Sequence, residues 1–574
     1  MSYPQVYSQD RRLVPTGSRL VPGTGGDWFP HHPTPLQGVG AGTTAAGTSD
    51  WFPKANPYNT PTSLPDPRSA TLSTCGMLDA TPTDNAVVEE KTHPLKTNNP
   101  ENNWFTPQPY TYQTIGAVRA VFQNHTLIAD EPGLGKTIQA LLIAAIIKPR
   151  KILIICPSSL ISNWENETRR SGVAEHTPAR TITSITSSTR TPRVLPSTGI
   201  VITSDTLATS RKPLARLLEA WQPGLLVYDE AHRAKNIRAK RTRTMLQLAR
   251  KAGKTVCLTG TPIASSPLDV LPLLTMLGKT SFFPADFKTY YTRDNYWGTP
   301  EPIPERMPDL HQRLNDHVWT RRTKKGVLSD LPPKMRHTQL VDIPDAQRTQ
   351  AFSDVATKLT RKGYTHAELQ DHAKEFVSQM RHATGILKIE SAVQWITTHV
   401  EGTGRPLIAW CIHTEVIHQL ADKLTHVLPR ATVRTYYGAT SKAERDTTVG
   451  AFQAGKVDVL IAQITAAGVG LTLTRAQDAL FVETEWTPAL VTQAEDRIHR
   501  ITQTSPVTIT TLIAQGTLDP VIHKVLTSKA STLDQLTPGS DHHVEAHIHT
   551  DGASVTRLLA TIATTIIDTK GTRE

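Results

Sequence analysis

The sequence lacks closely spaced cysteine pairs and long apolar runs, and it has no excess of acidic residues. Its four cysteines lie far apart, with no Cys-x-x-Cys pair, which excludes a zinc ribbon and a disulfide framework and favours a reducing compartment. No apolar run approaches the roughly eighteen residues of a membrane span, and the start of the chain does not resemble a signal peptide. We therefore expect a soluble, intracellular protein of the cytoplasm or nucleoid, or of the host cytoplasm if the chain is viral.

What the chain does have is length and positive charge. Its 574 residues suffice for two hydrophobic cores with insertions. The formal net charge of +11 and a pI near 9.4 suit a polyanionic partner. Three basic stretches could neutralise phosphates, although a solvated surface is the better explanation for any single lysine. These stretches are Arg233–Arg243, Lys251–Lys254 and Arg321–Lys325.

Residues 1–105 are rich in Pro, Gly, Thr and Ser and have little aliphatic periodicity, which is typical of a disordered tail. Within this tail an aromatic motif, Asp27–Pro30, recurs as Asp50–Pro53, with a looser copy at Trp104–Phe105. Exposed Trp-Phe pairs could dock a protein partner, because bulky rings anchor interfaces. They could equally pack back on the rest of the chain.

Beyond the tail, apolar strand patterns alternate with helical patterns over residues 106–275 and again over 386–530. This alternation predicts an α/β fold with two RecA-like parallel-sheet lobes. Residues 276–385 lack the rhythm, and the charged amphipathic pattern of Gln347–His382 favours a helical protrusion or linker between the lobes. Residues 531–574 read as a C-terminal tail with one helix.

A glycine-rich loop separates the apolar run Thr126–Ala129 from the helical pattern Ile138–Ile147. Its glycines let backbone N–H groups turn toward phosphate oxygens at the positive end of the helix. Lys136 would reach the terminal phosphates, and the Thr137 hydroxyl would bind Mg²⁺. The sequence therefore predicts a nucleotide-phosphate site made of Glu131, Pro132, Gly133, Leu134, Gly135, Lys136 and Thr137.

Two acidic residues, Asp229 and Glu230, directly follow the apolar run Gly224–Tyr228, which predicts a buried parallel strand. Carboxylates at the C-terminal end of such a strand lie in the crevice where ligands bind. Asp229 could hold Mg²⁺, and Glu230 could polarise the water that attacks a γ-phosphate. A solvated acidic turn is the alternative, which the upstream phosphate loop makes less attractive.

Two arginines, Arg497 and Arg500, lie three residues apart, so on a helix they would share one face. An arginine supplied from a second lobe to a transferring phosphoryl group is worth roughly 10³–10⁵ in rate. A salt-bridged surface helix is the alternative, because Glu495 and Asp496 are adjacent. Taken with the loop and the acid pair, the arginines complete a predicted catalytic set of Lys136, Asp229, Glu230, Arg497 and Arg500.

In this order, the motifs resemble those of the Swi/Snf-like DNA-dependent ATPases of helicase superfamily two, from about Tyr110 to about Leu533. The resemblance is carried further by Arg233–Asn236, Leu258–Pro262, Arg321–Lys334 and Glu483–Pro488. The last segment, with Thr465–Thr474, is most similar to the annealing-helicase, fork-remodelling branch. Departures from the family pattern at Pro132, Gly468–Val469 and Thr502 leave the predicted catalytic set intact, although Pro132 removes one loop N–H.

The resemblance implies further roles that spacing alone does not identify. It implies that Gln113 reads adenine, that Gly470 belongs to the nucleotide site, and that ATP and Mg²⁺ are used, with Thr137 and Asp229 as metal ligands. It also implies sequence-independent, salt-sensitive contacts to DNA phosphates. The candidate contacts are Pro157, Ser158, Thr203, Ser204 and Thr465.

The expected function is therefore ATP-driven translocation along duplex or forked DNA in replication, recombination or repair. Two alternatives stay open at this point. One is a helicase that separates the strands of DNA or RNA, and the other is a catalytically idle DNA-binding scaffold. The complete catalytic set speaks against the scaffold.

Overall fold

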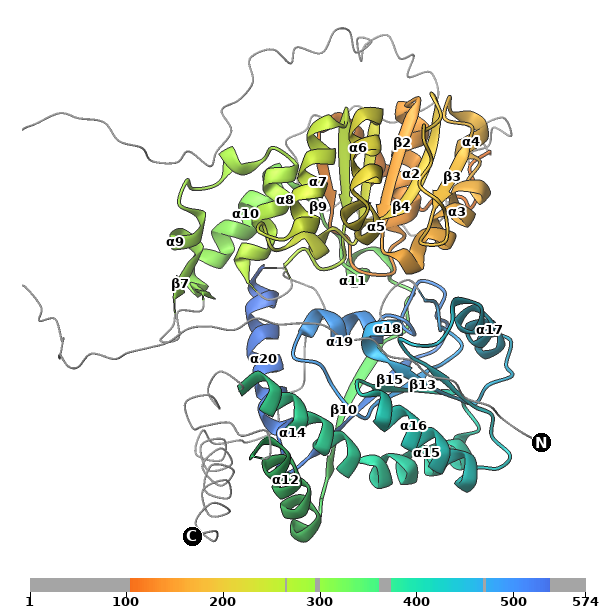
Figure 1. The fold of residues 1–574 in the computed structure, drawn as a ribbon, viewed down its shortest axis with the longest axis vertical. Helices are drawn as coiled ribbons and strands as arrows, with labels where there is room; N and C mark the ends of the chain where they lie inside the picture. The colour runs from red at the N-terminus through yellow and green to blue at the C-terminus, as the bar shows by residue number, and fades with distance from the viewer. Residues whose placement is uncertain (1–103, 264–265, 295–299, 361–372, 468–470, 537–574) are drawn as a thin grey trace, which may run out of the picture. The chain divides into compact units, whose positions relative to one another are not determined.

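The computed structural model describes most of the chain beyond the N-terminal hundred residues (Figure 1). The Trp-Phe motifs at Asp27–Pro30 and Asp50–Pro53, the expected C-terminal helix and all but the last two residues of the expected disordered tail fall outside the described part. Those two residues, Trp104 and Phe105, pack back on the first lobe, where Phe105 is buried and the Trp104 ring stacks on His176. Among the described residues, no helix combines the length and the apolar character that a membrane span requires. The described ranges are 104–263, 266–294, 300–360, 373–467 and 471–536.

The first lobe is built on a seven-stranded sheet in which every strand pairing is parallel. Parallel neighbours need crossover connections, and helices supply them here. In spatial order the strands are β3 (Ile182–Ile185), β4 (Gly199–Ser204), β2 (Lys151–Cys156), β5 (Leu225–Asp229), β6 (Lys254–Leu258), β1 (Thr126–Ile128) and β9 (Trp319–Thr320).

Helices cover both faces of this sheet (Figure 1). Strand β2 shows why, because Ile152 and Ile154 pack in one hydrophobic cluster while Leu153 and Ile155 pack in another. Successive side chains of a strand point to opposite faces, so a strand buried on both faces is apolar throughout. The helices are α1 (Thr111–Phe122), α2 (Lys136–Ile147), α3 (Ile161–Arg170), α4 (Val173–His176), α5 (Asp205–Ser210), α6 (Lys212–Trp221), α7 (Lys240–Lys251), α8 (Leu271–Met276), α9 (Phe287–Tyr291), α10 (Met307–His317) and α11 (Lys324–Val327).

The second lobe repeats this plan with a six-stranded sheet that is also parallel throughout. Its strands, in spatial order, are β10 (Lys334–Val341), β15 (Val507–Ala514), β14 (Asp478–Phe481), β11 (Leu407–Cys411), β13 (Val459–Gln463) and β12 (Val433–Tyr436). Its helices are α12 (Asp345–Thr360), α14 (Ala373–Leu387), α15 (Ile389–Thr403), α16 (Thr414–Val427), α17 (Lys442–Gln453), α18 (Ile464–Ala467), α19 (Pro488–Glu495) and α20 (Asp519–Leu536). The expectation of two parallel α/β sheets is confirmed.

The expected helical linker over 276–385 is only partly helical. It also contributes an edge strand to each sheet, β9 beside β1 and β10 beside β15, and an antiparallel pair, β7 (Thr292–Asp294) with β8 (Pro300–Pro302). These strands give a weak sequence signal, because β9 has two residues and β10 mixes half-buried and exposed side chains. The linker thus contributes one strand to the sheet of each lobe.

Candidate functional site

Three of the predicted motifs meet at one edge of the first sheet. Strands β5, β6 and β1 are consecutive neighbours in this sheet, and parallel strands end at the same edge. The segments that follow them are the acid pair, the Thr259–Thr261 turn and the phosphate loop. A Cβ added at Gly260 would lie 2.6 Å from Cγ of Pro132, so the turn and the phosphate loop are in direct contact.

The phosphate loop has a backbone that favours glycine. Gly133 and Gly135 have φ values of 91° and 72°, in the region that other residues rarely adopt. Helix α2 begins immediately afterwards, at Lys136. The Lys136 ammonium donates to the carbonyl oxygens of Asp130 and Glu131, at 2.8 and 3.2 Å. The predicted order of strand, loop and helix is observed, and the loop curls around its own lysine.

Gln113 lies against this loop from α1. Its side chain is buried, and its amide Nε2 donates to the carbonyl of Leu134 at 3.2 Å. Its Oε1 accepts from the backbone N–H of Tyr110 at 3.0 Å. A second contact comes from Tyr112, whose hydroxyl donates to the same Leu134 carbonyl at 3.1 Å. The structure thus brings Gln113 to the site, with its amide bonded to the chain itself.

Asp229 ends strand β5 and is buried. Its Oδ2 accepts from the indole N–H of Trp164 at 2.8 Å, and its Oδ1 accepts from the backbone N–H of Glu230 at 2.9 Å. Burial, followed by the charge of Glu230, raises the pKa of Asp229 to about 6. A buried acid therefore lies next to a second acid that is partly exposed.

Glu230 is held in a left-handed backbone conformation, with φ of 50°, and His232 contacts it. Nδ1 of His232 lies 3.2 Å from Oε2 of Glu230 and 2.9 Å from Oγ1 of Thr259. Burial would raise the pKa of Glu230. The hydrogen bond and charge of His232, together with the positive charges of Lys136 and Arg497, outweigh burial and lower this pKa to about 2. Glu230 is therefore ionised at neutral pH.

Arg497 and Arg500 are brought to the site, but not on a helix. Helix α19 ends at Glu495, so the prediction that a helix places both arginines on one face is wrong. The N–H of Arg497 bonds three residues back, and its carbonyl accepts from the N–H of Leu473 rather than from the next helical turn. A Cβ added at Gly133 would lie 3.4 Å from Cγ of Arg500, which puts this arginine beside the phosphate loop.

The alternative of a salt-bridged surface helix is also wrong. Arg497 is only 3% exposed. Arg500 is half-buried, and burial together with the charge of the neighbouring Arg497 lowers its pKa to about 9. Glu495 pairs with Lys334 and Arg336, at 2.8 and 2.6 Å, instead of with the arginines. The acids thus bind the linker, while Arg500 donates to Oγ1 of Thr472 at 2.9 Å and Arg497 donates to the carbonyl of Leu471 at 3.3 Å.

The basic stretch Arg321–Lys325 was a candidate for neutralising phosphates, but in the structure two of its members pair with acids of the chain itself. Nε of Arg322 lies 3.2 Å from Oδ1 of Asp130. Lys324 is buried, its backbone N–H donates to Glu131 at 2.6 Å, and its ammonium lies 2.6 Å from Oδ1 of Asp496. Lys324 thus ties the phosphate loop to the arginine segment, through its backbone N–H on one side and its ammonium on the other, a role that we did not foresee.

The candidate DNA contacts divide into two groups. Thr203 is fully buried and its hydroxyl donates to the carbonyl of Ile185 at 3.0 Å, while Ser204 is buried and caps α5. The expectation that these two hydroxyls meet phosphate is therefore wrong for this structure. Ser158 and Thr465 are exposed. The remaining DNA-contact candidate, Pro157, is buried. Of the candidates for the nucleotide site, Thr137 is the half-buried second residue of α2, and Gly470 lies outside the described residues.

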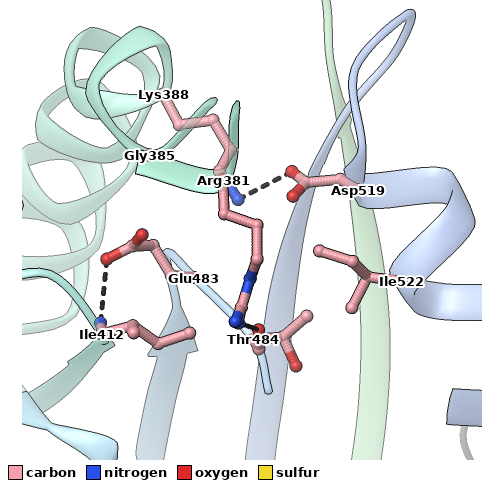
Figure 2. Close-up of a pocket in the computed structure, with 8 residues that line it drawn as sticks. All are labelled: Arg381, Gly385, Lys388, Ile412, Glu483, Thr484, Asp519 and Ile522. Atoms are coloured by element: carbon pink, nitrogen blue, oxygen red, sulfur yellow. Dashed lines mark hydrogen bonds and ion pairs between the residues drawn. The ribbon is translucent and has the colours of Figure 1, made fainter. Parts of the chain in front are cut away.

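A separate small pocket lies in the second lobe (Figure 2). Its Lys388 is 1% exposed and pairs with Asp519 at 2.7 Å, and its Glu483 accepts from the N–H of Ile412 at 2.8 Å. The pocket contains none of the predicted site residues, and paired charges occupy it. Its lining residues are Arg381, Gly385, Lys388, Ile412, Glu483, Thr484, Asp519 and Ile522.

Comparison with known proteins agrees with this architecture. The SNF2-related domain matches residues 93–399, and the helicase conserved C-terminal domain matches residues 388–502. DNA annealing helicase and endonuclease ZRANB3 of Bos taurus is 31% identical over 438 residues, covering 73% of this chain and 40% of that protein. SWI/SNF-related matrix-associated actin-dependent regulator of chromatin subfamily A-like protein 1 of Xenopus tropicalis is 30% identical over 422 residues, covering 72% and 43%. The chain thus spans less than half the length of these relatives.

Among solved structures, the chain is similar to the Sulfolobus solfataricus SWI2/SNF2 ATPase core in complex with dsDNA. The two sequences are 23% identical, the TM-score is 0.35, and the match covers 75% of this chain and 93% of that chain.

Proposed function

Because the chain belongs to the SNF2-related domain family, we propose that it is a DNA-dependent ATPase that hydrolyses ATP to move along duplex or forked DNA. The observation that carries the proposal is the meeting of the phosphate loop, the acid pair and the Thr259–Thr261 turn at one sheet edge, with Arg500 beside the loop. The names of the relatives, which include annealing helicases, favour a role in DNA replication or repair.

We infer that ATP phosphates enter the loop that now surrounds the Lys136 ammonium. The positive-φ glycines turn backbone N–H groups inward, and the start of α2 adds the positive end of its dipole. Lys136 would exchange its two carbonyl acceptors for phosphate oxygens. Gln113 would have to release Leu134 in the same way to read an adenine ring.

The acid pair suits Mg²⁺. Asp229 has a raised pKa because it is buried and because the charge of Glu230 repels its own charge, and a divalent cation would relieve this repulsion. Among the described residues, no group of three His, Cys, Asp or Glu side chains could hold a metal ion, which fits an ion that takes its remaining ligands from phosphate and water. Asp229 and the Thr137 hydroxyl would hold it, and when bound it would neutralise charge on the transferring phosphoryl group.

Glu230 would orient the attacking water. With a pKa near 2 it is ionised but is a weak base, because a good general base has a pKa near the working pH. Its contact with His232 keeps the pKa low, so loosening that contact would make Glu230 a stronger base. Arg497 and Arg500 would then stabilise the charge that develops on the phosphoryl oxygens.

Phosphate contacts to DNA would come from exposed residues of both lobes, Ser158 in the first and Thr465 in the second. Such contacts position the motor without reading bases, so binding would be independent of sequence and sensitive to salt.

The proposal is tested by measuring ATP hydrolysis without nucleic acid and with duplex DNA, forked DNA, single-stranded DNA or RNA. Each condition is repeated with Lys136→Ala and Glu230→Gln. Stimulation by duplex or forked DNA that both variants abolish is the expected result. Stimulation by RNA alone would favour an RNA helicase, and no hydrolysis by the wild-type chain under any condition would favour an idle scaffold.

A further inference from the structure

The segment after the acid pair has one sign of charge. No Asp or Glu lies between Ala231 and Leu268. Several of the basic residues stand in the first turn of α7, where the positive end of the helix dipole disfavours cations by about 0.3–1 kcal/mol each. The basic residues are Arg233, Lys235, Arg238, Lys240, Arg241, Arg243, Arg250, Lys251 and Lys254.

The part of this segment that projects, Lys235–Lys240, is called the basic loop below. Its two ends are fixed to the same buried carboxylate. Arg233, just before the loop, and Arg241, just after it, lie 2.8 and 3.0 Å from Oδ2 of Asp205 on α5. Thr242 adds a buried hydrogen bond to the carbonyl of Ala234, at 3.1 Å. The base of the loop is therefore rigidly held.

The interior of the basic loop is also ordered by its own hydrogen bonds. Oδ1 of Asn236 accepts from the N–H of Arg238 at 2.9 Å. The Arg243 guanidinium donates to the carbonyl of Arg238 at 2.6 Å. These bonds use the backbone of Arg238, and they hold the backbone of the loop in one conformation.

The cations of the basic loop have no carboxylate partners. Lys235, Arg238 and Lys240 are exposed, and none of them forms an ion pair with any carboxylate of the described residues. Ile237 lies among them with 45% of its surface exposed. Three free cations around an exposed apolar side chain suit a polyanion that also offers apolar surface, as DNA does through its sugars and grooves.

We propose that the basic loop binds the phosphate backbone of duplex DNA, with Ile237 against the groove. This inference rests on the proposed function, and it adds a contact surface to Ser158 and Thr465. The basic loop is joined to the catalytic acids by a single 3₁₀ turn, η3 (Ala231–Ala234), so the contact lies close in sequence to Glu230.

The test compares two double variants of the full chain, each of which removes one exposed lysine and one exposed arginine. Lys235→Ala with Arg238→Ala removes cations of the basic loop. Arg250→Ala with Lys251→Ala removes two exposed cations from the far end of α7 and is the matched control. Affinity for fluorescent duplex DNA is measured by anisotropy at a series of salt concentrations, without nucleotide, and thermal unfolding checks that both variants fold.

Each phosphate contact contributes about 0.9 to the slope of log K against log salt, so losing two contacts lowers that slope by about 2 and weakens binding roughly tenfold. We expect this loss in the basic-loop variant, near-normal binding in the control, and recovery of the slope with Lys235→Arg and Arg238→Lys. An unchanged slope in the basic-loop variant would overturn this inference alone. Failure of the wild-type chain to bind duplex DNA would overturn the proposed function with it, and preferential binding of an acidic peptide would reassign the loop.

Discussion

Lys324 joins the phosphate loop to the arginine segment, so replacing it tests that connection. Its ammonium donates to Oδ1 of Asp496 at 2.6 Å and to the carbonyl of His499 at 2.8 Å, and all three groups are buried. Lys324→Met keeps most of the side-chain volume and leaves the Asp496 carboxylate without its main partner. Breaking a buried pair from one side costs about 3–5 kcal/mol. Since Lys334 is a second cation 3.8 Å from Asp496, we expect about 3 kcal/mol.

The assay is equilibrium unfolding in urea, followed by circular dichroism, for a double-mutant cycle of Lys324→Met and Asp496→Asn. Each single variant should lose about 3 kcal/mol, and the double variant should lose much less than the sum, because neither charge is then left unpaired. Lys325→Met is the control, because Lys325 is exposed next to Lys324 and should change stability by less than about 0.5 kcal/mol. Additive single losses would refute the pairing.

Two further predictions concern the Thr259–Thr261 turn and the acid pair. Gly260→Ala places a methyl group 2.6 Å from Cγ of Pro132 and should lower the free energy of unfolding in urea by about 1–3 kcal/mol. The control Gly402→Ala lies in a helix with open space at its Cβ and should raise this free energy by up to about 1 kcal/mol. Equal effects of the two substitutions would contradict the contact. His232→Ala removes the hydrogen bond and charge that keep the pKa of Glu230 near 2, so this pKa should rise. Glu230 works in its ionised form, so the acid limb of the pH–rate profile for ATP hydrolysis should shift to higher pH than in the wild type. An identical pH–rate profile would show that His232 does not act on the site.

The motifs that follow sheet strands were readable from the sequence because the signals are local. Gly224–Tyr228 is a continuous apolar run, and the strand it predicted is observed as β5, ending at Asp229. Gly133 and Gly135 have the positive φ values that a phosphate loop requires. Because neighbouring parallel strands end at the same edge of a sheet, the loop and the acid pair could then be predicted to lie close together.

The contacts that tie the site together were not readable, because they join distant residues. Lys324 and Asp496 are separated by 172 positions, and no spacing rule pairs them. A basic stretch suggests phosphate binding equally well whether its cations face DNA or buried acids. Only the fold distinguishes the paired Lys324 from the exposed cations Lys235 and Arg238.

One of two errors had a signal in the sequence that we passed over. Ser204 precedes Asp205 at the start of α5, and a serine there is a common helix N-cap, which explains why its hydroxyl is occupied. For Arg497 and Arg500, a three-residue spacing suits a helix, but tertiary contacts decided otherwise. The carbonyl of Arg497 accepts from Leu473, which takes it out of the helical pattern.

Displacement of a third strand from a DNA triplex tests the central claim most directly, because movement along the duplex removes that strand without separating the other two. With ATP, the wild-type chain should displace the third strand and leave a plain duplex intact, while Glu230→Gln should bind the same DNA and displace nothing. Hydrolysis of ATP on duplex DNA without triplex displacement would contradict translocation. Separation of the plain duplex would show a strand-separating helicase instead.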